Sequence, residues 1–83
     1  MDLASLIRSV IDHLKKAKSK FYNSDSYDEK KACYNSYIQG VEKFNKIYKT
    51  NNTTEQAHQK LREILISALK EAESMKNNLN DTP

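Results

Sequence analysis

Hydrophobic residues recur every three or four positions along three segments of the chain. In the first segment the successive spacings are 4, 3, 4, 3 and 4. Because an α-helix completes a turn in about 3.6 residues, this period places the apolar side chains on one helical face. The pattern predicts a helix over residues 3–22 whose core stripe consists of Leu3, Ile7, Val10, Leu14, Ala17 and Phe21.

Turn-forming residues separate this stripe from two more. The stretch "NSDSYDE" breaks the first period, and Ser26 with Glu29 has the spacing of a capping box at a helix start. The stretch "TNNTT" has no helix-period residue, and Thr53 with Gln56 repeats the capping-box spacing. These boundaries predict helices over residues 27–49 and 54–78. Their stripes are Tyr34, Tyr37, Ile38, Val41, Phe44 and Tyr48, and then Ala57, Leu61, Ile64, Ala68, Ala72, Met75 and Leu79.

Three helices of this length joined by short loops run antiparallel to their chain neighbours. We therefore predict an all-α fold, an antiparallel up-down-up three-helix bundle. It forms a single domain over residues 1–79, with residues 80–83 as a frayed tail or the start of a linker. The composition agrees, since the 83 residues include one Gly and one Pro.

The length and composition of the chain limit which cellular compartment and which class of function we expect. A chain of 83 residues buries only about 60% of its unfolded surface and leaves little room for an enclosed active site. Cys33 is the one cysteine, so no intrachain disulfide forms, which favours a reducing, intracellular compartment. No run approaches 18 apolar residues, which predicts neither a membrane span nor a signal peptide. We expect a soluble, cytoplasmic protein.

The residues that usually carry catalysis are not arranged for it. His13 and His58 have no Cys, Asp or Glu at metal-ligand spacing on the same helical face, which favours surface histidines. Cys33 lies at the edge of the apolar arc, as expected of a half-buried, inert thiol. We therefore expect no enzyme activity, no metal site and no cofactor.

The third helix carries more apolar residues than one core stripe requires. Leu65 and Leu69 lie near the stripe's edge, but Ile66 lies about 180° from the stripe residue Ala57. An apolar strip flanked by charges of both signs is typical of a groove that binds an amphipathic peptide. The flanking charges are Arg62, Glu73 and Lys76.

Gly40, in the middle of the second helix, has two possible explanations. Glycine there costs about 0.5 to 1 kcal/mol relative to alanine. It either permits close packing of a neighbouring helix or forms a smooth floor where another backbone approaches. Gly40 and Ile47 share one edge of the apolar arc. The candidate peptide-binding residues are therefore Leu65, Leu69, Glu73, Arg62, Ile66, Lys76, Gly40 and Ile47.

The chain from about Leu6 to Leu79 resembles the microtubule-interacting and transport (MIT) domain family. The resemblance lies in the helix order and lengths, in "YDEKKACY" at residues 27–34, and in the helix-three run of Leu69, Ala72, Glu73, Met75 and Lys76. It implies an adaptor, often N-terminal in AAA ATPases such as spastin and katanin, that docks C-terminal tails of ESCRT-III subunits.

The resemblance also implies roles for two residues of the third helix. Leu69 would hold a ligand leucine and Glu73 would pair with a ligand arginine, in a groove between the second and third helices. Lys30, Lys70 and Glu71 depart from the family's usual residues, and the groove between the first and third helices remains an alternative site. The resemblance implies recruitment from the cytoplasm to endosomal or other remodelling membranes through partners.

Two other classes of function remain open. The cluster Lys15, Lys16, Lys18 and Lys20 within a net charge of +3 allows a basic bundle that binds nucleic acid or an anionic membrane. The second class is a structural module that mediates oligomerisation. The adaptor hypothesis instead predicts no nucleic acid partner, at most weak peripheral membrane contact, and a monomer in isolation.

Overall fold

Three helices make up nearly all of the chain that the structure describes. The computed structural model describes residues 3–50, without the side chain of residue 50, and residues 55–81. The helices are α1 (Leu3–Asn23), α2 (Tyr27–Thr50) and α3 (Glu55–Asn80). Each bound lies within two residues of the predicted one. The predicted capping role of Thr53 and the rest of the stretch 51–54 lie outside the described residues, as do residues 82 and 83 of the tail.

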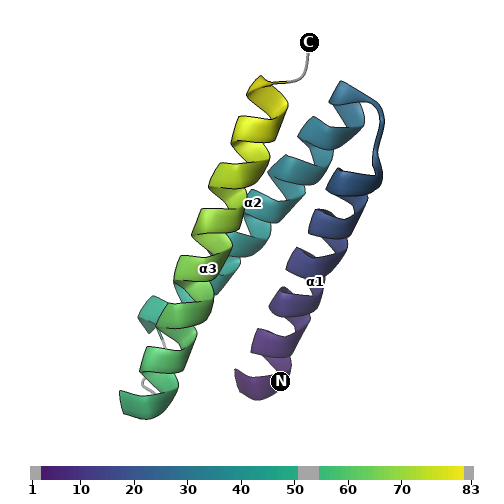
Figure 1. The fold of residues 1–83 in the computed structure, drawn as a ribbon. Coiled ribbons are helices and arrows are strands. Elements are labelled where there is room, and N and C mark those ends of the chain that lie inside the picture. The colour runs from purple at the N-terminus through teal and green to yellow at the C-terminus, as the bar shows by residue number, and fades with distance from the viewer. Residues whose placement is uncertain (1–2, 51–54, 82–83) are drawn as a thin grey trace.

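The helices run up, down and up, as predicted (Figure 1). Helix α2 packs extensively against both α1 and α3. Helices α1 and α3 make far fewer contacts with each other. The described part of the chain contains no strand. None of the described helices is long and apolar enough to cross a lipid bilayer. The fold is therefore the predicted antiparallel three-helix bundle.

The core forms where the three predicted stripes meet. Phe21, Phe44 and Met75, one from each helix, are fully buried at its centre. Ala57 is an exception, because it is exposed although the sequence pattern placed it in the third stripe. The regular spacing of the buried residues, continued back from Leu61, reaches His58 instead. The buried set is Val10, Leu14, Ala17, Phe21, Tyr37, Val41, Phe44, Ile47, Leu61, Leu65, Ala68, Ala72, Met75 and Leu79.

The turn between α1 and α2 is closed by backbone hydrogen bonds. The Lys30 amide donates to the Ser26 carbonyl at 3.0 Å, which begins α2 directly after Ser26 as the sequence predicts. The Lys30 side chain then reaches the other two helices. Its Nζ lies 5.4 Å from the centre of the Phe21 ring and donates to Asn78 Oδ1 at 3.1 Å. Lys30 thus links α1, α2 and α3 at this end of the bundle.

The seam between α1 and α2 is closely packed around Gly40. A Cβ atom on Gly40 would lie 2.7 Å from Leu14 Cδ2 and 2.8 Å from His13 Cδ2, closer than van der Waals contact allows. The glycine therefore permits the close approach of α1, which decides between the two explanations of Gly40. His13 Nε2 donates to the Ser36 carbonyl at 2.8 Å. His13 is thus a half-buried structural residue of this seam, and its interpretation as a surface histidine is wrong.

Candidate peptide-binding site

Five of the predicted site residues lie on the exposed side of α3. They form a continuous strip along the helix that we call the outer ridge. At its centre, Ile66 and Leu69 keep 42% and 51% of their surface exposed, so the two form a small apolar patch between charged residues. The outer ridge consists of Arg62, Ile66, Leu69, Glu73 and Lys76, all exposed.

The other three predicted site residues are buried and do not line an accessible groove. Leu65 is 9% exposed and belongs to the core, because the face of α3 that packs on α2 is wide enough to include it. Gly40 faces α1. Ile47 lies seven residues, or about two turns, further along α2 on the same side and is 7% exposed. The structure therefore places these three residues in the core and in the packing of α1 on α2, and their role in peptide binding stays a prediction.

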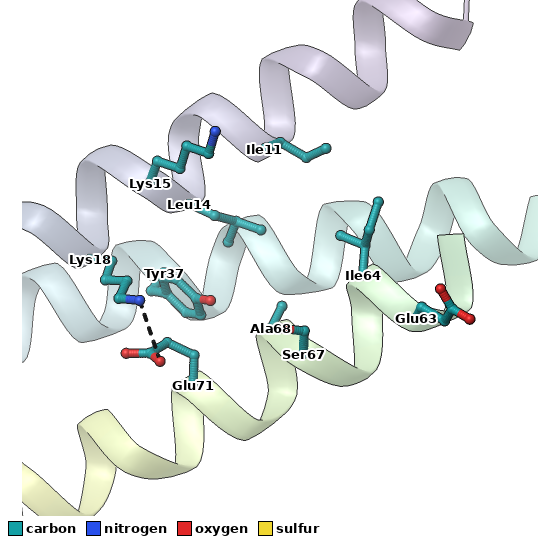
Figure 2. Close-up of a pocket in the computed structure, with 10 residues that line it drawn as sticks. All are labelled: Ile11, Leu14, Lys15, Lys18, Tyr37, Glu63, Ile64, Ser67, Ala68 and Glu71. Atoms are coloured by element: carbon teal, nitrogen blue, oxygen red, sulfur yellow. Dashed lines mark ion pairs between the residues drawn. The ribbon is translucent and has the colours of Figure 1, made fainter. Parts of the chain in front are cut away.

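The structure instead opens a cleft between α1 and α3, which we call the α1/α3 cleft (Figure 2). Its volume is about 380 Å³. The floor is made by the buried residues Leu14, Tyr37 and Ala68, so that all three helices contribute to it. Half-buried Ile11 and Ile64 form the walls. The cleft exists because α1 and α3 both pack on α2 but hardly on each other.

Tyr37 gives the apolar floor a polar atom. Burial, reinforced by the negative charge of Glu71 and by Tyr22, raises the pKa of Tyr37 to about 12. The phenol is therefore neutral at physiological pH and keeps its proton. Within the described part of the chain the Tyr37 hydroxyl forms no hydrogen bond. In Figure 2 it projects from α2 into the space between the other two helices.

The two rims of the α1/α3 cleft carry opposite charges. Lys15 and Lys18 lie on the α1 rim, while the α3 rim carries Glu63, Ser67 and Glu71. This arrangement creates an electric field across the opening. A bound segment would therefore meet positive charge on one side and negative charge on the other.

One end of the cleft is closed by contacts to Glu71. Lys18 Nζ lies 3.6 Å from Glu71 Oε2, and the Tyr22 hydroxyl donates to Glu71 Oε1 at 2.9 Å. Burial, that hydrogen bond and the charge of Glu71 together raise the pKa of Tyr22. We call these three residues the Glu71 clasp. It ties the end of α1 to α3 and fixes how far the two helices separate there.

The lysine cluster on α1 is partly neutralised. Lys16 Nζ lies 3.1 Å from Asp12 Oδ2, and Lys18 is engaged by Glu71. Exposed pairs of this kind are weak, but they lower the local positive potential that nucleic acid or an anionic membrane would require. Lys15 lines the cleft with Lys18 rather than extending a separate basic face.

His58 and Cys33, which were considered for metal binding and catalysis, both pack against other side chains. The His58 ring stacks on Tyr48, with 4.2 Å between ring centres, and Cys33 is half-buried as predicted. Among residues 3–50 and 55–81, no three His, Cys, Asp or Glu side chains gather in a group that could hold a metal ion.

Sequence reasoning named the groove between the first and third helices only as an alternative and identified none of its residues. Ile64 was predicted as a member of the third core stripe, but it is only half-buried and lines the cleft together with half-buried Ile11. Comparison with known protein families, with curated proteins and with solved structures finds no match.

Proposed function

We propose that this chain is a non-catalytic adaptor that binds a short peptide segment of a partner protein in the α1/α3 cleft. The observation that carries the proposal is an accessible cleft with an apolar floor drawn from three helices and with rims of opposite charge. Ligand sites are typically concave and apolar with a few placed polar groups. The cleft has this composition, with the Tyr37 hydroxyl as the polar group within its floor.

The dimensions of the cleft favour a few side chains over a folded partner. Its volume of about 380 Å³ is near the lower limit of roughly 300–1,000 Å³ for ligand pockets. A segment in extended conformation would place alternate side chains between Ile11 and Ile64. Its backbone would remain accessible to the Tyr37 hydroxyl, which forms no hydrogen bond within residues 3–50 and 55–81. A basic side chain would suit Glu63 on the α3 rim.

The resemblance to MIT domains gives the class of ligand to test first. It implies C-terminal tails of ESCRT-III subunits as partners and recruitment of a larger parent protein, such as an AAA ATPase, to membranes that are being remodelled. Within that function, the outer ridge is the second candidate site. The exposure of Leu69, the largest among the big apolar side chains described, favours it.

A titration of labelled ESCRT-III tail peptides against matched variants tests the proposal. Ser67→Arg places a long charged side chain at the cleft rim from an exposed position, so the fold should be retained. We expect at least a tenfold loss of affinity, which corresponds to about 1.4 kcal/mol. Lys70→Arg, also exposed and on α3 but away from the cleft, is the control and should bind normally.

Two ridge variants separate the candidate sites. If the cleft is the site, Leu69→Asp and Glu73→Lys should bind as well as the unmodified chain. If Leu69→Asp and Glu73→Lys weaken binding tenfold while Ser67→Arg has no effect, the peptide binds at the outer ridge. Circular dichroism establishes that each variant is folded. Failure of every tail peptide to bind would contradict the ligand class itself.

The competing basic-surface function makes a different prediction about salt. Binding to nucleic acid or anionic lipid releases counterions, so the affinity would fall steeply as salt rises. It would also depend on Lys15 and Lys16 rather than on Ser67. For the cleft we expect a shallow salt dependence, since apolar contacts supply most of the binding free energy.

A further inference from the structure

The outer ridge belongs to a longer exposed line on α3 with the spacing of a helix–helix seam. Starting at Glu55, successive steps of 4 and 3 residues alternate along the whole helix. Such spacing keeps side chains on one face that a second helix can pack against. All members are exposed and they are Glu55, Gln59, Arg62, Ile66, Leu69, Glu73, Lys76 and Asn80.

The residues of this line are arranged symmetrically about its midpoint, so that two antiparallel copies would present complementary residues to each other. Ile66 and Leu69 lie at equal distances along the helix from a point between residues 67 and 68, and so do Arg62 and Glu73. A two-fold axis through that point would place Ile66 of one copy on Leu69 of the other. It would also place Arg62 of each copy opposite Glu73 of the other.

We propose that the outer ridge binds the outer ridge of a second copy of this chain, with the two α3 helices antiparallel. The apolar pair forms the centre of the contact and the charged pairs flank it on both sides. A parallel arrangement would instead oppose Arg62 to Arg62 and Glu73 to Glu73, which is unfavourable. Charge complementarity thus selects both the partner and its direction.

The residues that this contact requires are accessible and unpaired. Within residues 3–50 and 55–81, neither Arg62 nor Glu73 forms an ion pair, so pairing with a second copy breaks no contact in the chain. Leu69 is half exposed and gains the most from being covered. The surface is separate from the α1/α3 cleft, so this inference goes beyond the proposed function.

The contact is small, which sets the concentration at which it forms. Two large apolar side chains per copy bury far less than the roughly 1,200 Å² at the lower end of stable interfaces. We therefore expect a monomer at micromolar concentration and a dimer only near ~1 mM. This agrees with the expectation of a monomer in isolation while giving the outer ridge a role where copies are concentrated.

Charge reversal on the free chain provides the test. In sedimentation velocity across the range up to about 1 mM, the unmodified chain should show a weight-average mass that rises with concentration. Arg62→Glu alone and Glu73→Arg alone each create two like-charged pairs and should weaken dimerisation at least threefold. An equimolar mixture of these two variants restores both opposite-charge pairs and should recover the dimer, as should the double variant Arg62→Glu/Glu73→Arg.

Two controls make the outcome decisive. Lys70→Glu makes the same change of charge as Arg62→Glu on an exposed position outside the line and should leave dimerisation unchanged. Leu69→Asp should abolish the dimer while circular dichroism still shows a folded helical domain. A mass that stays monomeric throughout, or a mixture that associates no better than its separate components, would overturn the proposal. The proposal would also be overturned if the outer ridge bound tail peptides but did not bind a second copy of the chain.

Discussion

The two sides of α1 differ in how closely a neighbouring helix approaches. On the α2 side, Gly40 brings the helices so near that a single methyl group would clash with Leu14 and His13. On the α3 side, a cleft of about 380 Å³ remains between Ile11 and Ile64. Both sides belong to one bundle with one core. The α1/α2 seam is closely packed, whereas the α1/α3 cleft stays open.

The difference follows from the side chains that the helices turn toward each other. The absence of a Cβ at Gly40 lets α1 and α2 approach, and the bond from His13 to the Ser36 carbonyl fixes their register. Between α1 and α3, Lys18 and Glu71 meet through the ends of their side chains at 3.6 Å. Because this contact joins the ends of two long side chains, it links α1 to α3 without bringing their backbones close.

Leu14→Ala should have the largest effect on stability, because the Leu14 side chain belongs both to the α1/α2 seam and to the floor of the cleft. We expect a loss of about 2 to 5 kcal/mol in the free energy of unfolding, measured by urea denaturation. Leu6→Ala removes the same atoms from the same helix at an exposed position and should cost less than about 1 kcal/mol. Equal losses in the two variants would mean that the seam is not closely packed.

Alkaline pH should destabilise the floor of the cleft through Tyr37. The pKa of its phenol is about 12 in the folded chain and about 10 in an unfolded one, so folding favours the neutral form. This stabilisation is complete below pH ~10 and is lost as the pH rises through about 12, up to ~2–3 kcal/mol.

Tyr37→Phe is the control for this titration, because it keeps the ring and removes the ionisable hydroxyl. Urea denaturation at a series of pH values should show a smaller loss of stability for Tyr37→Phe than for the unmodified chain between pH ~10 and 12. Identical pH profiles for the two chains would show that the floor is hydrated and that Tyr37 ionises normally.

Gly40→Ala tests how closely α1 and α2 pack. The added methyl would press on Leu14 and His13, at a cost of about 1 to 3 kcal/mol. Better helix propensity offsets about 0.5 to 1 kcal/mol of it, which leaves a net loss near ~1 kcal/mol. In a Leu14→Ala background the methyl has more room, so the cost of Gly40→Ala should fall. Strict additivity in this double-mutant cycle would contradict the described contact.

Tyr22→Phe should have the smallest effect, because it removes one exposed hydrogen bond from the Glu71 clasp. A loss near ~0.5 kcal/mol is expected, at the low end for hydrogen bonds. The same change in a Glu71→Gln background should cost less, since the charged acceptor is already gone. Equal costs in both backgrounds, measured by thermal denaturation, would mean that the clasp does not form in solution.

Periodicity was sufficient to predict the helices and the fold, and the reason lies in stripes such as Val10, Leu14 and Ala17. Their spacing repeats over several turns, so small errors average out. Single positions at the ends were less secure, as Ala57 shows. A spacing of 3 or 4 back from Leu61 fits the period equally well, and only the stack of His58 on Tyr48 identifies the residue that faces α2.

The candidate site was harder to predict, because it depends on which edges of the helices face each other. Ile66 was expected outside the core stripe and is exposed, whereas Leu65 and Leu69 were both placed near the stripe's edge and only Leu65 is buried. Gly40 was consistent with a seam or a groove floor until the position of α1 was known. Sequence spacing describes one helix at a time, whereas the α1/α3 cleft arises from the relative placement of three.

Mapping a bound peptide onto the folded chain tests the central claim, that the α1/α3 cleft is the binding site. An NMR titration of the labelled chain with an unlabelled ESCRT-III tail peptide follows each backbone amide and isoleucine methyl separately. We predict that the largest shifts occur at the Ile11 and Ile64 methyls and at the Ser67 amide, with little change at Leu69. Shifts confined to Ile66, Leu69 and Glu73, with the Ile11 and Ile64 methyls unmoved, would contradict the claim.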